Sequence, residues 1–477
     1  NKAYNLSVSI KFRGNLVIDT LQQAVNILVQ RHECLRATFS PDGRFMYIYN
    51  NVNIEISLDD ISSMPTAEKE QSTETLIKEE VNTLFDLVNG PLFRVNLIKI
   101  DDYEYTLTLT IHHIIGDGLS IDIILEELST LYSAYIKNEA PNLPMPERFS
   151  EFAEKINSFM ESSEYKNLED FWLNIYKESV PIVELPIDHI RPSLRTYNSN
   201  RLDFPLDDTI INSLKNVGMN AGCSLVTTLL AAFEIFLCKL TGQNDLVVGF
   251  PSSGNILHDM RQLIGDCVNL LPLRSKINPN ISFFDYLKQR NSQLFDAYEN
   301  QQISFGHLLK SIAITRDPSR VPLVPVILTV DLNRDIESEF SFAGLSHEFK
   351  VNPREYATFE IQLHIFRAKN GPQFQWNYNT TLFKEETINQ MMITFEGIIN
   401  KLILNPNNPL SEITGGDYLA DYNTLNSTEI PYPNVTLTEL LRKQAAITPN
   451  NIALEFHESK TTYDELHKKV NQLAHYL

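Results

Sequence analysis

The chain has 477 residues and is 43% hydrophobic, which allows roughly two to four domains with buried cores. A formal charge of −20 at pH 7 repels phosphate backbones, so nucleic acid is excluded as an expected partner, and the charge otherwise indicates only solubility. Four widely spaced cysteines without a CxxC pair argue against a zinc ribbon or a disulfide framework and favour a reducing, cytoplasmic setting, and no apolar run is long enough to make a membrane an expected partner.

The first part of the chain predicts two strand-and-helix units. Leu6–Phe12 alternates apolar and polar residues, which is typical of a strand. Asp19 is expected to cap the following helix, whose apolar side chains recur at helical spacing. A clearer strand is predicted over 101–111, and Ser120 is expected to cap the helix behind it. The strand and this helix are joined by the run HHIIGDG at 112–118.

Three prolines between 181 and 192 mark a crossing into a second half of mixed helices and strands. A long apolar helix is predicted over Leu225–Leu240, with short strands at 245–250 and 324–332. Residues 415–434 are rich in Asn, Thr, Gly and Pro, which indicates a linker. Behind the linker, the pattern predicts two helices with a strand at 452–456 between them.

The run at 112–118 contains residue types that suit proton transfer. A neutral histidine can take a proton from a nucleophile near pH 7. Glycine permits a tight turn, and backbone amides at a helix start can face developing negative charge. A buried Asp117 needs either a cationic partner or several hydrogen-bond donors.

Three interpretations of the two histidines compete. Both can be structural, which is the ordinary role of an isolated pair. A metal site is disfavoured, because strand alternation points neighbours to opposite faces and one carboxylate does not complete a zinc set. The third interpretation is histidine-assisted acyl transfer, which needs no serine or cysteine nucleophile.

The string HHIIGDG resembles the HHxxxDG signature of condensation domains of nonribosomal peptide synthetases, which belong with the chloramphenicol acetyltransferase-like acyltransferases. Five further stretches resemble motifs of this family in the same order and cover residues 1 to about 420. They are RHECLR at 31–36, FDLVNGPLFR at 85–94, LPIDHIRP at 185–192, IGDCVNLLPLR at 264–274 and RDPSR at 316–320.

Several positions depart from the usual family pattern. Leu119 stands where the family often has tryptophan, and ENQQISF at 299–305 differs from the sixth family motif. The stretches VVGFPSSG at 247–254 and DCVN at 266–269 resemble domains that follow polyketide modules. These departures bear on substrate preference, not on the type of reaction.

The resemblance implies an α+β fold (an α/β sandwich) of two chloramphenicol acetyltransferase-like lobes, arranged in a V around a central tunnel. Residues 1–177 would form the N-lobe and 178–414 the C-lobe. The strings LNST at 425–428 and TYDEL at 462–466 resemble the entry into an adenylation domain. Residues 415–434 are therefore expected to be a linker, and 435–477 an N-terminal fragment of an adenylation domain that cannot activate an amino acid.

The implied reaction is amide (peptide) bond formation between a donor acyl thioester and an acceptor aminoacyl thioester. Both substrates would be carried on the 4′-phosphopantetheine arms of carrier proteins, with no cofactor bound directly. The expected partners are an upstream donor carrier protein, a downstream acceptor carrier protein and the adenylation domain of the same module.

Alternative members of the family are less compatible with the motifs. An epimerisation domain shares HHxxxDG, but the adenylation start behind it argues against that assignment. An inactive recruitment platform tends to lose the second histidine, and heterocyclisation domains replace the histidines with aspartates.

The resemblance also implies roles for individual residues of HHIIGDG. His113 would orient the acceptor amine or accept its proton, and His112 would be structural. The amide of Gly118, at the helix start, would stabilise the tetrahedral intermediate.

Other motif residues would support this site. Asp117 is expected to pair with a buried Arg274, with Arg36 nearby, and Asn269 is expected to belong to the same supporting set. Arg31 and Arg36 are five residues apart, so on a continuing helix they would diverge by about 140°. We therefore predict that Arg36 faces the core and that Arg31 lies nearer the tunnel.

Overall fold

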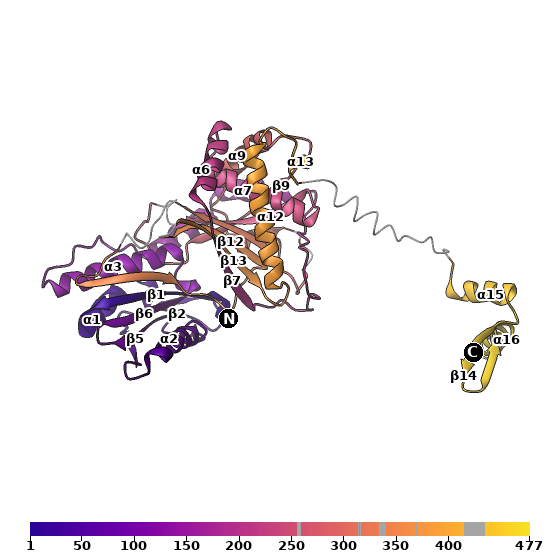
Figure 1. The fold of residues 1–477 in the computed structure, drawn as a ribbon, viewed down its shortest axis with the longest axis horizontal. Coiled ribbons are helices and arrows are strands. Elements are labelled where there is room, and N and C mark those ends of the chain that lie inside the picture. The colour runs from indigo at the N-terminus through magenta and orange to yellow at the C-terminus, as the bar shows by residue number, and fades with distance from the viewer. Residues whose placement is uncertain (255–258, 313, 315, 333–339, 369–370, 415–434) are drawn as a thin grey trace. The chain divides into compact units, whose positions relative to one another are not determined.

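The computed structural model describes residues 1–254, 259–312, 314, 316–332, 340–368, 371–414 and 435–477. Its internal contacts divide the chain into two compact units, Asn1–Gly416 and Asp417–Leu477, each described here by itself (Figure 1). The predicted linker at 415–434 lies outside the described residues.

The first sheet of the larger unit has the strand order β11-β1-β6-β5-β4. Its strands are β1 (Asn5–Gly14), β4 (Ser57–Asp60), β5 (Phe93–Asp101), β6 (Glu104–His112) and β11 (Leu345–Val351). The apolar face of this sheet packs on α1 (Ile18–Arg31) and α3 (Gly118–Ile136) in one core. The other face carries hydroxyl pairs, including Ser7–Thr110 at 3.0 Å, and lies against α2 (Thr66–Val81).

The second sheet has the order β7-β13-β12-β10-β8-β9. Its strands are β7 (Ser199–Pro205), β8 (Asp245–Ser253), β9 (Val268–Lys276), β10 (Val326–Asp331), β12 (Ile361–Ala368) and β13 (Gly371–Asn379). Helices α6 (Asp208–Asn220), α7 (Leu225–Thr241) and α12 (Glu385–Leu404) contact one another beside this sheet (Figure 1). Phe233 and Phe395 meet edge to face at 5.6 Å between ring centroids, which joins α7 to α12.

The larger unit contains further described elements. They are η1 (Lys2–Tyr4), η2 (Cys34–Arg36), β2 (Ala37–Phe39), β3 (Met46–Ile48), η3 (His113–Ile115), α4 (Phe149–Met160), α5 (Ser163–Tyr176), α9 (Phe283–Glu299), α10 (Phe305–Ser311) and α13 (Leu410–Thr414).

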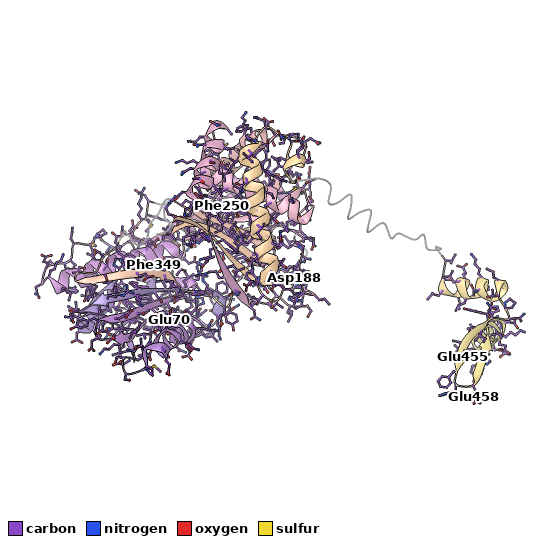
Figure 2. The ribbon with its side chains drawn as sticks, viewed as in Figure 1. Glu70, Asp188, Phe250, Phe349, Glu455 and Glu458 are labelled. Carbon is purple, nitrogen blue, oxygen red and sulfur yellow. The ribbon has the colours of Figure 1, made fainter. Side chains whose placement is uncertain are left out.

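The second half of the chain contributes to both sheets. Strand β11 pairs antiparallel with β1, with Phe349 opposite Ile10. Figure 2 labels Phe349, on the edge strand β11 of the first sheet, and Phe250, on β8 of the second. Strand β11 lies within the range 178–414 predicted for the second lobe but pairs in the first sheet, because strand periodicity does not say which sheet a strand joins. The lobe boundaries stay predictions.

Two predicted helix caps are wrong. The first residue before α1 is Val17, which makes no capping bond, and Asp19 lies inside the first turn. Helix α3 is capped by Asp117, and Ser120 returns a bond to the backbone of Asp117 as the third residue of a capping box. The predicted apolar face of α1 is confirmed, because its buried side chains are Leu21, Ala24, Val25, Leu28 and Val29.

The smaller unit contains α15 (Leu437–Ile447), β14 (Ile452–Phe456), β15 (Ser459–Thr462) and α16 (Tyr463–Tyr476). The predicted helix-strand-helix pattern is confirmed, with a second short strand added. Among its described residues only Ala445 is a buried hydrophobic side chain. The exposed large apolar side chains include Leu437, Ile447, Leu454, Phe456, Leu473 and Tyr476.

Among the described residues, no single helix has the length and apolar composition of a membrane span. The consecutive helices α6 and α7 meet that test only as a pair, and they are bent by 101° relative to each other.

Candidate active site

The HHIIGDG run forms the connection from β6 to α3. Strand β6 ends at His112, a short helix covers His113–Ile115, and α3 begins at Gly118. A side chain at Gly116 would place its Cβ 2.7 Å from Cδ1 of Ile111, so glycine allows the connection to lie this close to the strand. The sequence prediction of a strand, a tight loop and a helix is confirmed here.

His112 lies at the buried end of this connection. Its side chain is 8% exposed, and its Nδ1 accepts a hydrogen bond from the amide of Ile114 at 3.1 Å. The rings of Phe85 and Tyr4 each lie 6.0 Å from its centroid. Burial lowers the pKa of His112 to about 4, so the ring is neutral at pH 7. These contacts support the predicted structural role.

His113 is more accessible and has a carboxylate neighbour. Its Nδ1 lies 3.3 Å from Oδ1 of Asp266, and the two side chains are 33% and 39% exposed. Burial opposes the charged ring, but the hydrogen bond and the negative charge of Asp266 together raise the pKa of His113. Because Nδ1 is engaged by Asp266, the neutral ring presents the lone pair of Nε2.

Asp266 is the residue that the sequence reasoning missed. It stands inside IGDCVN, a motif that was singled out as a whole, but no pattern connects it to His113. It precedes β9, whereas His113 follows β6 in the other sheet. A carboxylate among mostly apolar neighbours in this motif was the available signal.

Asp117 is held by hydrogen-bond donors and not by arginine. Its side chain is 1% exposed. Oδ1 accepts from the amide and the hydroxyl of Ser120, each at 3.0 Å, and Oδ2 accepts from the amide of Cys267 at 3.1 Å. Burial raises the pKa of Asp117, while these donors act in the opposite direction. The predicted pairing with Arg274 is wrong, because donors from two segments already satisfy the carboxylate.

Arg274 instead stabilises the second half of the chain. Its guanidinium is 4% exposed and bonds to both carboxylate oxygens of Asp245, at 2.8 and 2.6 Å. It also donates to the carbonyls of Ile175 and Ser179, at 2.6 and 2.8 Å. The residue therefore joins β9 to β8 and to the end of α5.

Arg31 and Arg36 have different surroundings, as predicted. Arg31 donates to Glu127 on α3 at 2.8 and 3.1 Å, and His32 contacts the same carboxylate at 2.9 Å. Arg36 donates to backbone carbonyls, including that of Val29 at the end of α1. Arg36 is half-buried, and its core-facing position stays a prediction. A tunnel position for Arg31 stays a prediction.

Asn269, on β9, forms hydrogen bonds with a neighbouring segment. The Asn269 amide donates to the carbonyls of Gln301 and Ile303, and its oxygen accepts from the amide of Phe305 at 3.1 Å. Asn269 thus joins β9 to the ENQQISF stretch at 299–305.

Gly118 is exposed in the first turn of α3, and a Cβ there would meet nothing within 4 Å. First-turn amides have no acceptor within their own helix.

The LPIDHIRP motif is structural. Asp188 accepts from the amide of Lys384 and the hydroxyl of Thr387, both at 2.8 Å, and so binds the start of α12 (Figure 2). Arg191 forms a two-bond pair with Glu360 at 2.7 and 2.9 Å. These contacts hold the chain crossing against the start of α12 and the residue before β12.

In the described part of the chain, no group of three His, Cys, Asp or Glu side chains is arranged to hold a metal ion. A cavity of about 730 Å³ opens between the end of α5 and residues 311–325, but none of residues 112–118 lines it.

Comparison with known proteins identifies relatives along the whole chain. The family profile described as "Condensation domain" matches residues 1–417. Gramicidin S synthase 2 of Brevibacillus brevis is 32% identical over 485 residues, and bacitracin synthase 3 of Bacillus licheniformis is 29% identical over 482. The alignments cover 100% of this chain but only 10% and 7% of those relatives.

Solved structures share the fold. The X-domain from teicoplanin biosynthesis superposes with a TM-score of 0.78 at 21% identity, covering 86% of this chain and 92% of that one. The four-domain nonribosomal peptide synthetase AB3403 has the same score at 21% identity and covers 100% of this chain and 37% of its own. VibH, a condensation enzyme, has a TM-score of 0.68 at 16% identity, covering 86% of this chain and 96% of its own.

Proposed function

The chain belongs to the condensation-domain family of nonribosomal peptide synthetases, and from this premise we propose that it joins a donor acyl thioester to an acceptor aminoacyl thioester. Both substrates would arrive on the phosphopantetheine arms of carrier proteins. The observation that carries the proposal is the His113–Asp266 contact at the start of α3, which leaves one accessible basic nitrogen in the family's signature motif.

The reaction assigned to this site is aminolysis of a thioester. The acceptor amine attacks the donor carbonyl carbon, a carbon–nitrogen bond forms and the carbon–sulfur bond breaks. Nε2 of His113 orients the amine and takes up its proton, which then passes to the departing thiolate. The first-turn amide of Gly118 faces the developing oxyanion. Asp266 holds the ring in the tautomer that this role needs.

The smaller unit supports a role for the chain inside a larger synthetase. Its apolar side chains are exposed on both helices and on the hairpin, so this unit by itself buries little surface. We assign 435–477 to the edge of an adenylation domain whose remaining parts cover these side chains. The partners are then an upstream and a downstream carrier protein and that adenylation domain.

The test uses the whole chain with two separately prepared carrier proteins. One carries a panel of peptidyl, fatty acyl or polyketide-type donors, and the other carries aminoacyl acceptors. Intact-mass measurement should show the donor mass added to the acceptor carrier. His113→Ala should fold, bind the carriers and slow the reaction by about 10²–10⁴-fold, which is typical for loss of a positioned base.

Other outcomes identify other functions. An epimerisation domain would exchange the α-proton of a carrier-bound substrate with solvent without joining the two carriers. A recruitment platform would bind the carriers and produce neither change. Parental rates from His113→Ala would contradict the assignment of this residue.

A further inference from the structure

Arg354 lies where the chain passes from the first sheet to the second. After β11 ends, the backbone continues along β1, because the amide of Asn352 donates to the carbonyl of Ser7 at 3.1 Å. On the same strand Asn5 lies opposite His112. Arg354 then meets the second sheet, where the hydroxyl of Ser199 on β7 donates to its carbonyl at 3.1 Å.

This backbone path brings Arg354 close to the candidate site. Its positive charge acts on His113, which lies after β6, and on His364, on β12, and opposes protonation of both rings, although Asp266 keeps the pKa of His113 raised overall. Backbone contacts on either side of Arg354, to Ser7 on β1 and to Ser199 on β7, place this residue between the two sheets.

The guanidinium of Arg354 has no counterion among the residues that the structure describes. It is half-buried, and within the described ranges no carboxylate or other acceptor bonds to it. Burial, together with the charge of Arg201, lowers its pKa to about 10, so it stays cationic at neutral pH. Arg201 itself is paired with Asp203 at 3.0 Å and donates to the carbonyl of Val351.

An uncompensated, partly desolvated cation has a free-energy cost unless something of opposite charge meets it. The phosphodiester of a carrier arm is unsuitable, since the arm must place its opposite end, the thioester, at His113. The anion has to belong to the substrate portion that surrounds the reacting atoms.

We propose that Arg354 is a specificity determinant that receives a carboxylate carried by a substrate, so that the domain prefers an acidic acyl or aminoacyl unit. This inference rests on the proposed function and names its substrate class. The carboxylate belongs either to the side chain of the acceptor or to the acyl group of the donor. Both sources offer the same two-oxygen group to the planar guanidinium.

The test measures binding, which does not depend on turnover. Unreactive pantetheine amides of succinate and succinamate mimic the donor, and those of aspartate and asparagine mimic the acceptor. Calorimetry on the whole chain should show that the acid of at least one pair binds about tenfold or more tightly than its amide isostere. The pair that shows the preference identifies the source.

Variants assign the preference to this side chain. Arg354→Gln keeps much of the bulk without the charge and should bring the acid-to-amide ratio close to one, whereas Arg354→Lys should retain part of it. The melting temperature of Arg354→Gln should stay level or rise, because no ion pair is lost. Arg13→Ala, an exposed change on β1, serves as the control.

Three results would overturn the inference. The wild-type chain could bind acid and amide equally or bind neither, or Arg354→Gln could retain the preference. A third is an equal loss of condensation rate for neutral and acidic substrates in Arg354→Gln, which would make Arg354 a general catalytic group. If the chain binds the acid more tightly than the amide but condenses no pair of substrates, the proposed function is wrong and the carboxylate-binding site is still supported.

Discussion

His113 Nδ1 lies 3.3 Å from Asp266 Oδ1, and this contact joins the connection after β6 to the segment before β9. It fixes the orientation of the ring and assigns its hydrogen to Nδ1 when the ring is neutral. Both side chains are about one-third exposed, so solvent screens the attraction between them. The contact therefore matters more for the tautomer and pKa of His113 than for the stability of the fold.

Asp266→Asn should move the acidic limb of the pH profile for kcat/KM to lower pH. Asp266 raises the pKa of His113, and the base form of His113 is the one that works, so activity rises as this group loses its proton. Without the carboxylate the proton leaves at lower pH. The rate at high pH should also fall, because the ring is less well oriented.

The same substitution has a defined effect on stability. A raised pKa in the folded state contributes stability below the unfolded value of 6.5, and this contribution is lost as pH rises through the folded pKa. Asp266→Asn should therefore lower the melting temperature at pH 5.5 more than at pH 8.5. The exposed substitution Asp170→Asn is the control and should leave both measurements unchanged. If Asp266→Asn does not shift the acidic limb of the kcat/KM profile, the role of Asp266 is contradicted.

His112 should make the larger unit sensitive to acid. Its pKa of about 4 lies below the unfolded value of 6.5, so the unfolded chain binds the proton first as pH falls. Stability should decrease between pH 6.5 and 4, by up to about 3 kcal/mol from this group. Urea unfolding at pH 7 and pH 4.5 measures the loss. His112→Gln should reduce the difference between the two pH values, whereas the exposed His189→Gln should leave it unchanged.

Asp117→Ala should lower stability through the lost helix cap. Removal of an N-cap costs about 0.5–2 kcal/mol, and the buried amide of Cys267 is left without its acceptor at a further cost of about 1–3 kcal/mol. Asp117→Asn keeps an acceptor oxygen and should lose less. Because Arg274 pairs with Asp245, the effects of Asp117→Ala and Arg274→Ala should add to within about 0.5 kcal/mol. A large coupling energy between the two substitutions would instead indicate that Asp117 and Arg274 interact directly.

Deletion of 435–477 should leave condensation intact when both carrier proteins are supplied. The larger unit ends at Gly416, and the described hydrophobic clusters are built from residues of that unit. Mass measurement of product at equal protein concentration gives the comparison. Aggregation of the truncated chain, or loss of product from well-folded protein, would show that the segment belongs to the catalytic body.

The local elements could be read from the sequence because they depend on neighbouring residues. The apolar face of α1, the limits of α7 and the strand at 452–456 all follow from side-chain spacing. The HHIIGDG connection was placed for the same reason, since a period-two pattern ends where a helical one begins. Helix caps were less predictable, because Asp117 and Ser120 both suit a cap and only their mutual bonds decide between them.

The sequence by itself therefore determined the family, the mixed helix-and-strand elements and the histidine pair at a strand end. Tertiary structure alone decided which groups meet across the chain: Asp266 with His113, Cys267 with Asp117, and β11 with the first sheet. Such contacts join residues far apart along the chain, and no periodicity records them. A buried carboxylate such as Asp117 is equally well satisfied by an arginine or by amides, so its partner depends on which segment the fold brings within 3 Å of it.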